Sequence, residues 1–314
     1  MGLFFISKMQ LDNIIVKSHE PVRLDRYIRR FYPNITQGVI EKSLRNEQIK
    51  LNGKKVKSSA RVIDDDVITI VAGIFGKDED VIEKKIFSQN AISLAGKLLS
   101  DYLLFSNEDF IAINKPAGLA VQGGSKISLS IDESLAYINS TQNASYKLVH
   151  RLDKDTSGVL LIANGFDSAA KLGKAFHDHL MAKCYIALLS GVPKELNGTI
   201  ENNIGKDRSG IFEIVRELES GGKLAKTNYK ILKYNKGVSL VEFQPETGRM
   251  HQLRFHAKFL GCPIIGDVKY GGKPHSNMLL HAQKLTISKD VFGKEIIIKS
   301  KLPDAFDEFD LKNN

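Results

Sequence analysis

Hydrophobic positions near the start of the chain follow first a helical and then a strand period. RLDRYIRRFY at 23–32 places apolar side chains at helical spacing, and Pro33–Asn34 ends the predicted helix. Thr36 is suited to cap a second helix. The stretch 49–71 then alternates as strands do, with Asn52–Gly53 as a tight turn between two of them. The pattern predicts a small domain of two helices followed by a short sheet.

Strand and helix patterns interleave from residue 101 onward. The expected strands are DFIAIN at 109–114, VLLIA at 159–163, CYIALLSG at 184–191, VSLVEFQP at 238–245 and short strands around 264–270, 279–287 and 295–299. The expected helices are 132–139, 166–181 and 248–260, the last closed by Gly261. Because hairpin-like strand pairs outnumber strand–helix–strand crossovers, the pattern favours an α+β fold.

The same pattern divides the chain into five parts. We expect an N-terminal segment at 1–20, the small domain at 21–72, a linker at 73–100 that becomes ordered near its end, a larger domain at 101–302 and a fraying acidic tail at 303–314. The apolar run GLFFI at 2–6 is too short for a signal peptide or a membrane span, so we expect a cytoplasmic protein without a membrane partner.

The net charge of +9 is concentrated in a short stretch of the 314 residues. Residues 21–61 hold 11 basic against three acidic side chains, whereas the rest of the chain is nearly neutral. Such concentration indicates a polyanion partner, although a solvated basic face is the alternative. The candidate RNA-binding residues are Arg23, Arg26, Arg29, Arg30, Arg45 and Lys54.

Several kinds of chemistry lack their motifs. The chain has no GxGxxG after a strand, no GxxxxGK[ST] and no HExxH, which argues against dinucleotide, P-loop and zincin sites. Cys184 and Cys262 have no CxxC spacing, so neither a disulfide framework nor a thiolate zinc site is expected. The eight histidines form no pair with metal-ligand spacing on one helix face. We therefore expect neither a metal nor a small-molecule cofactor.

A charged loop precedes one predicted strand in LVHRLDKDTSGVLLIA at 148–163. Asp153 lies there between Arg151 and Lys154, and GRMHQLRFH at 248–256 supplies further arginines. A carboxylate paired with arginine stays ionised and can serve as a nucleophile or base. From spacing alone, a structural ion pair is the favoured interpretation.

HRLDKDTSGVLLIA resembles the signature of the pseudouridine synthases of the large-subunit ribosomal type. Three further blocks agree with that family in order, at 108–125, 239–271 and 279–285, and the segment 21–72 resembles the S4-type RNA-binding module. The resemblance implies a small S4-like α/β module followed by a catalytic domain with a mixed, mostly antiparallel sheet.

The resemblance also implies roles for individual residues. Asp153 would be the catalytic aspartate, Tyr185 the aromatic that packs on the target base, and Arg254 the partner of Asp153. Arg151 would support the RNA around the extracted nucleotide, and Leu280 would line the uracil pocket. The chain departs from the family pattern at two other positions, which are Met250 in place of threonine and Gln122 in place of histidine.

The implied activity is isomerisation of specific uridines to pseudouridine in large-subunit ribosomal RNA by a monomer that needs no cofactor. A uridine within folded RNA must first be flipped out of its stack. Asp153 could then act on the sugar carbon, on C6 of the uracil or as a base at the 2′ position, and the sequence leaves these open. Two alternatives are a pseudouridine synthase for transfer RNA and a non-catalytic RNA-binding factor in ribosome assembly.

Overall fold

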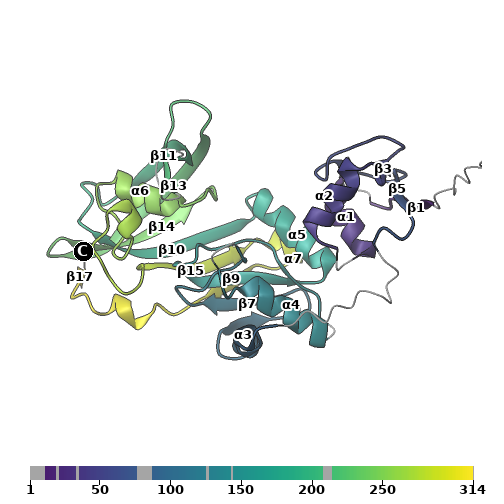
Figure 1. The fold of residues 1–314 in the computed structure, drawn as a ribbon. Coiled ribbons are helices and arrows are strands. Elements are labelled where there is room, and N and C mark those ends of the chain that lie inside the picture. Colours follow the sequence, from purple (N-terminus) through teal and green to yellow (C-terminus); the bar gives the residue numbers. More distant parts are fainter. Residues whose placement is uncertain are drawn as a thin grey trace, which may run out of the picture. The chain divides into compact units, whose positions relative to one another are not determined.

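The computed structural model describes residues 11–18, 21–32, 35–75, 87–124, 127–142, 144–207 and 214–313. The chain divides between Ile86 and Phe87 into an N-terminal unit and a C-terminal unit (Figure 1). The GLFFI run at 2–6 and the predicted helix end at Pro33–Asn34 lie outside the described residues.

The N-terminal unit contains two helices and two small sheets. Its elements are β1 (Leu11–Ile15), β2 (Val22–Arg23), α1 (Leu24–Phe31), α2 (Gln37–Arg45), β3 (Ile49–Leu51), β4 (Arg61–Val62) and β5 (Val67–Val71). The apolar stripe of α1 buries Leu24 and Ile28 completely, as its spacing predicts. Thr36 caps α2 by accepting the Val39 N–H at 3.4 Å. Both helices predicted here are confirmed.

The C-terminal unit is built on a large sheet. Its helices are α3 (Gln89–Leu99), α4 (Ile131–Thr141), α5 (Phe166–His177), α6 (Gln252–Phe259) and α7 (Lys289–Phe292), with short 3₁₀ turns η1 (Val268–Tyr270) and η2 (Asp304–Phe306). Its strands are β6 (Leu103–Ser106), β7 (Phe110–Lys115), β8 (Tyr146–Leu148), β9 (Ser157–Asn164), β10 (Met181–Ser190), β11 (Asn197–Lys206), β12 (Val215–Glu217), β13 (Lys223–Asn235), β14 (Val238–Pro245), β15 (Leu280–Ile287), β16 (Ile296–Lys299) and β17 (Lys312–Asn313).

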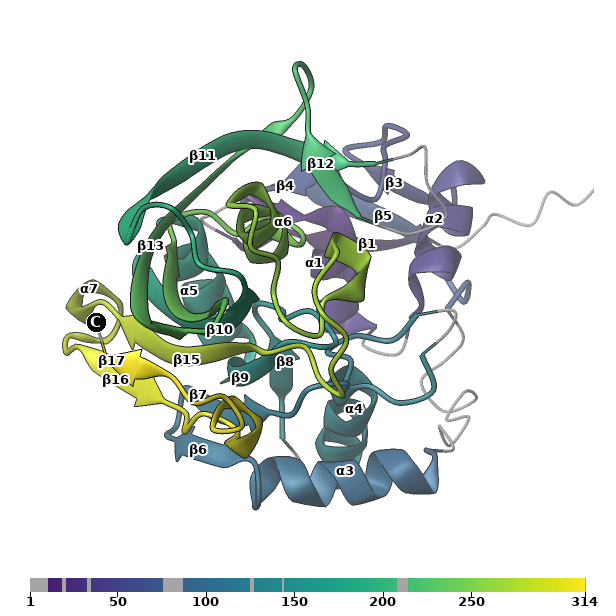
Figure 2. The same cartoon turned by 90° about the vertical axis from the view of Figure 1, so that its left-hand side faces the viewer.

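These strands form one mixed sheet in the order β12-β11-β13-β14-β10-β15-β9-β7-β6, with β16, β17 and β8 attached at its sides. Among the described strands, only β9 and β15 pair in parallel. The expectation of an α+β domain with a mostly antiparallel sheet is confirmed. Figure 2 shows β11 and β13 curving past α6 at one end of this sheet.

Helices cover both faces of the sheet. On one face, α3 and α4 pack on a cluster that includes Ile113 and Leu160, and α6 packs on a cluster that includes Ala187 and Leu280. On the other face, α5 and α7 pack on β7, β9, β15 and β16. Tyr185 contacts both clusters of the first face. The α3–α4 half and the α6 half of the unit therefore meet at this tyrosine.

The two halves of the sheet join at a narrow parallel contact between β9 and β15. Only two residue pairs form it, His281 with Ser157 and Ala282 with Gly158. Gly158 has a φ of 110°, and a Cβ at this position would lie 2.7 Å from the backbone N and C atoms of Ala282. Only glycine allows the two backbones to approach this closely. We call this contact the sheet joint.

The structure differs from the boundaries that the sequence suggested. Strand β1 precedes residue 21 and pairs with β5, so it belongs to the N-terminal unit. Helix α3 lies within the expected linker and buries Leu94 and Leu98 in the core of the C-terminal unit. The segment 303–313 does not fray throughout its length, because Phe306 is buried against Ile186 and Leu188. In each case an apolar face forms a contact that local composition does not reveal.

Two further expectations concern strands. IIGDVKY at 264–270 forms a turn and the 3₁₀ helix η1, so the short strand expected there is wrong. Its glycines explain the difference, since Gly266 has a φ of 85° and lies against the backbone of Asn277. The long strands β11 and β13 were not expected, because polar residues occupy much of both.

Replacing Gly158 tests the sheet joint. We expect Gly158→Ala to lower the stability of the C-terminal unit by about 3 kcal/mol, because the new methyl group combines backbone strain with a steric clash. Gly173→Ala is the matched control, since this glycine lies within α5 and a Cβ there would contact nothing within 4 Å. Calorimetric unfolding measures both, and equal stability of the two variants would contradict the argument.

Candidate active site

Asp153 lies in the loop that connects β8 to β9. Its neighbour Leu152 is buried in the core, and the Thr156 N–H donates to the Asp153 carbonyl oxygen at 3.1 Å. The Asp153 side chain keeps 26% of its surface exposed. The neighbouring side chains of Arg151 and Lys154 are exposed. The loop is therefore fixed through its backbone, while its charged side chains remain accessible.

Lys115, the last residue of β7, contacts the backbone of this loop and has no exposed surface. Its Nζ donates to the carbonyl oxygen of Lys154 and to two carbonyl oxygens of 116–119, each at 2.9 Å. Burial lowers the pKa of Lys115 to about 7, while the charges of Asp155 and Asp153 act in the opposite direction. Three acceptors match the three N–H groups of an ammonium ion. Lys115 thus ties the loop to the sheet.

Arg254, on α6, lies between two carboxylates. Its Nε and Nη2 donate to Asp267 in a bidentate arrangement, both at 2.7 Å, and the arginine is only 5% exposed. Its remaining Nη1 lies 3.6 Å from Oδ2 of Asp153. Burial disfavours the arginine's charge, but the hydrogen bonds and charge of Asp267 raise the pKa of Arg254 overall. Asp267 therefore holds the guanidinium through two hydrogen bonds, and the third nitrogen, Nη1, forms the longer ion pair with Asp153.

His251 is a second basic group beside Asp153. It has a left-handed φ of 51° immediately before α6, and its Nε2 lies 3.9 Å from Oδ2 of Asp153. Its Nδ1 lies 3.0 Å from the Tyr270 hydroxyl, which accepts the Val215 N–H at 2.8 Å. Burial, followed by the charge of Arg254, lowers the pKa of His251 against the effect of Asp153. When Tyr270 donates to Nδ1, the proton of the neutral ring is on Nε2, facing Asp153.

Tyr185 extends from β10 at a local irregularity of the sheet. The pairing between β10 and β15 shifts register between Cys184 and Tyr185, and such bulges re-aim side chains near functional sites. Burial, and after it the negative charge of Asp153, raises the pKa of the Tyr185 hydroxyl. The phenol is therefore protonated at neutral pH and within the electrostatic reach of Asp153.

The remaining two predicted site residues are Leu280 and Arg151. Leu280, at the start of β15, is 3% exposed and belongs to the cluster against which Tyr185 packs. Arg151 is exposed in the Asp153 loop. The structure thus brings Asp153 and Arg254 together directly and Tyr185 and Leu280 into one cluster, while Arg151 faces solvent.

The six basic residues suggested for RNA binding differ in their surroundings within the N-terminal unit. Arg23 forms a bidentate pair with the buried Asp25, and Arg29 donates to Gln37 at 2.7 Å. The Arg30 guanidinium lies 4.9 Å from the centre of the Tyr27 ring. The others are exposed, and their side chains make no hydrogen bond or ion pair within the described residues: Arg26, Arg45 and Lys54.

Sequence reasoning did not identify Lys115, His251 or Asp267 as parts of this site. Asp267 follows Arg254 by 13 residues, and the chain reverses between them at Gly261 and again at Gly266. An acidic residue flanked by glycines in IIGDVKYG is the signal that could have indicated a polar turn there. Lys115 gave no signal, because a lysine that ends a strand is ordinarily exposed.

Comparison with known proteins identifies the family. The model for RNA pseudouridylate synthases matches residues 109–259. The ribosomal large subunit pseudouridine synthase C of Rickettsia bellii is 49% identical over 300 residues, covering 93% of this chain and 99% of that protein. Its counterpart from Rickettsia typhi is 48% identical over 298 residues, covering 93% and 98%.

A solved structure agrees with these sequence matches. Human RNA Pseudouridylate Synthase Domain Containing 4 superposes with a TM-score of 0.58 at 28% identity, covering 69% of this chain and 94% of that one. The chain belongs to the RNA pseudouridylate synthase family, as its motifs suggested, and is an RNA pseudouridine synthase.

Asp267→Asn tests the arrangement around Arg254. We expect a loss of stability of about 3 kcal/mol, because the buried arginine loses its bidentate carboxylate. We also expect pseudouridine formation to slow at saturating RNA while RNA affinity stays unchanged, since Arg254 would turn from Asp267 toward Asp153. Single-turnover kinetics and filter binding measure the two effects. Asp167→Asn, at an exposed position on α5, is the control, and identical kinetics of the two variants would contradict the prediction.

Proposed function

We propose that this enzyme converts specific uridines of large-subunit ribosomal RNA to pseudouridine without a cofactor, with Asp153 as its essential group. The relatives named as ribosomal large subunit synthases support the substrate class, because they match this chain nearly end to end. The observation that carries the chemistry is the partly exposed Asp153 carboxylate beside the buried Arg254–Asp267 pair.

The reaction requires few protein groups. The C1′–N1 glycosidic bond breaks, the uracil turns and a C1′–C5 bond forms, while C5 loses a proton and N1 gains one. No electrons are lost or gained overall, so no redox cofactor is required. The Asp153 carboxylate can attack the sugar carbon, add to C6 or remove a proton at the 2′ position, and these routes remain alternatives.

Tyr185, Arg151 and Leu280 have proposed roles around the target base. A flipped uracil would stack on the ring of Tyr185, whose protonated hydroxyl lies near Asp153 and can take part in proton transfer at C5. Leu280 would form part of the apolar pocket wall. Arg151, exposed beside Asp153, would contact the RNA from which the uridine is removed.

The N-terminal unit is proposed as an S4-like RNA-binding module. Its two helices and short sheet present Arg26, Arg45 and Lys54 to solvent, where phosphate contacts would position the RNA without reading its sequence. Arg23 and Arg29 would support this surface through their internal partners. The enzyme is proposed to act as a monomer in the cytoplasm. None of the described helices is long and apolar enough to cross a membrane.

Two other functions are less well supported. The relatives named as ribosomal enzymes favour ribosomal RNA over transfer RNA as the substrate. A non-catalytic assembly factor would not need a partly exposed Asp153 to be held beside the buried Arg254–Asp267 pair.

A pseudouridine map tests the proposed activity. Large-subunit RNA from cells with and without the gene is labelled selectively at pseudouridine and analysed by primer extension. We expect discrete sites to disappear on deletion and to return with the wild type, but not with Asp153→Asn, whose turnover should fall by on the order of 10³-fold or more. RNA binding by this variant should stay near the wild-type level. Rescue by Asp153→Asn, or an unchanged map, would refute the proposal.

The basic surface of the N-terminal unit is tested separately. Arg26→Glu combined with Arg45→Glu should weaken RNA binding and reduce the salt slope of log Kd by about 2, because two phosphate contacts are lost. The reaction of a bound short substrate should change little. Lys294→Glu makes the same kind of charge change at an exposed position of the C-terminal unit and serves as control. A salt slope equal to that of the control variant would exclude the assigned surface.

A further inference from the structure

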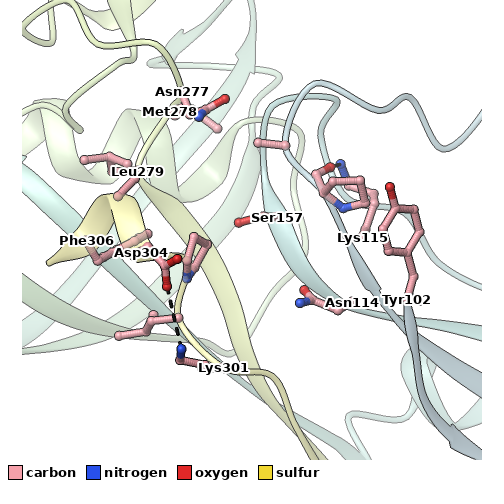
Figure 3. Close-up of a pocket in the computed structure, with 15 residues that line it drawn as sticks. Tyr102, Asn114, Lys115, Ser157, Asn277, Met278, Leu279, Lys301, Asp304 and Phe306 are labelled. Carbon is pink, nitrogen blue, oxygen red and sulfur yellow. Dashed lines mark hydrogen bonds and ion pairs between the residues drawn. The ribbon is translucent and has the colours of Figure 1, made fainter. Parts of the chain in front are cut away.

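A cavity of about 510 Å³ lies beside the sheet joint, and its lining includes Lys115 but not Asp153, Tyr185 or Arg254 (Figure 3). One wall consists of Lys115, Pro116 and Ala117 with Tyr102, and the opposite wall consists of Leu279 and 301–306. Ser157, the first residue of β9, lies between the walls. We call this cavity the joint pocket.

The joint pocket adjoins the loop that carries Asp153. Ser157 lines the pocket and follows Asp153 by four residues, while Lys115 lines it and binds the Lys154 carbonyl oxygen at 2.9 Å. Its wall residue Phe306 packs on Ile186, which points to the face of β10 opposite to that of the neighbouring Tyr185. The pocket wall at Phe306 and the Tyr185 side chain therefore lie on opposite faces of β10, and Ser157 and Lys115 connect the pocket to the Asp153 loop.

The walls of the joint pocket combine apolar surfaces with unused polar groups. Leu279 and Phe306 provide apolar surface on one side, the Tyr102 ring lies on the other, and Pro116 also lines the pocket. Within the described part of the chain, Asn114 and Asn277 form hydrogen bonds through backbone atoms only, and their carboxamides make none. Each carboxamide offers a donor and an acceptor together, which is what the hydrogen-bonding edge of a nucleobase requires.

A positive charge stands at the rim of the pocket. Lys301 pairs with Asp304 at 3.6 Å, but their side chains are 88% and 92% exposed. An ion pair this exposed contributes little, so the ammonium group can turn to a phosphate at small cost. Together the pocket presents apolar walls, two free amide edges and a cation, which are the groups that recognise an unstacked nucleotide.

We propose that the joint pocket binds a second, unpaired nucleotide of the substrate RNA, close along the RNA chain to the target uridine. This inference rests on the proposed function and extends it. The uridine occupies the Asp153 side of the loop and the second base the opposite side, so the loop separates them. The enzyme thereby selects uridines that have an unpaired neighbour, and this selection needs no additional contact to the uridine itself.

An abasic scan of the RNA tests this directly. Nucleotides near a mapped target uridine are replaced one at a time by abasic residues, and single-turnover pseudouridine formation is followed over a range of enzyme concentrations. For the wild type, one abasic position should raise the half-saturating concentration about tenfold, because the stacking of one base is lost. The rate at saturation should stay within about twofold, since the Asp153 side is unaffected.

Two pocket variants complete the cycle. Asn114→Ala removes a carboxamide from the pocket and Ala117→Phe fills its space, so each should raise the half-saturating concentration for intact RNA. For these variants, the abasic position that affects the wild type should raise that concentration no further. Ala170→Phe adds the same bulk on an exposed face of α5 and should keep the full abasic effect. Thermal unfolding verifies that each variant is folded. Because the two substitutions differ in kind, the same result from both could not come from a local distortion caused by one of them.

The outcomes separate the inference from the proposed function. If the wild type forms pseudouridine but both pocket variants show the wild-type abasic profile, the joint pocket binds no nucleotide and the inference is overturned. If no abasic position affects the wild type, the inference is overturned as well. If the wild type modifies no uridine of large-subunit RNA, the proposed function fails and the inference fails with it.

Discussion

The catalytic unit depends on one close backbone contact. Gly158 and Ala282 meet at the sheet joint, where a parallel ladder of two residue pairs forms the strand pairing between the two halves of the sheet. Asp153 precedes β9 in one half, whereas Arg254 and Tyr185 belong to the other. The distance between acid and arginine is therefore set by how closely two strands can approach. A glycine makes that distance possible, and helices on both faces keep the halves from turning about the joint.

Arg254 shows how a buried cation can lie beside a partly exposed carboxylate without forming a bidentate pair with it. A guanidinium that is 5% exposed needs hydrogen-bonded counter-charge, and Asp267 supplies it through two bonds of 2.7 Å. Asp153 lies farther away at 3.6 Å, so it feels the positive charge but retains lone pairs for a substrate. If Asp153 instead accepted the two hydrogen bonds from Nε and Nη2 of Arg254, those lone pairs would be occupied before RNA binds. Of the two carboxylates beside Arg254, Asp267 holds the guanidinium, and Asp153 keeps part of its surface exposed.

The parts of the fold that sequence predicted are those whose information is local. The spacing of apolar residues within Leu24–Phe31 predicts a helix, and that within Val238–Pro245 predicts a strand. Both elements form as expected. Strand β11, NGTIENNIGK, is polar and becomes a strand through pairing with β13, which no local pattern encodes. The same distinction applies to the site. The motif containing Asp153 indicated that residue directly, but Asp267 joins Arg254 only after two turns at glycines, and that contact exists only in the folded chain.

Lys115 shows why the Asp153 loop can be both charged and rigid. One of its three bonds goes to the Lys154 carbonyl oxygen of the loop and the other two go to carbonyl oxygens of 116–119, so Lys115 links these two segments without using any of the loop's side chains. Arg151 and Lys154 remain exposed, while the Lys115 bond to the Lys154 carbonyl oxygen and the Thr156 N–H bond to the Asp153 carbonyl oxygen hold the backbone that carries Asp153. A catalytic group held in place before substrate binds loses little free energy to reorganisation. Because Lys115 also forms part of the joint pocket, a base bound there would press against an element that already fixes Asp153, so substrate selection and catalysis would share one rigid loop.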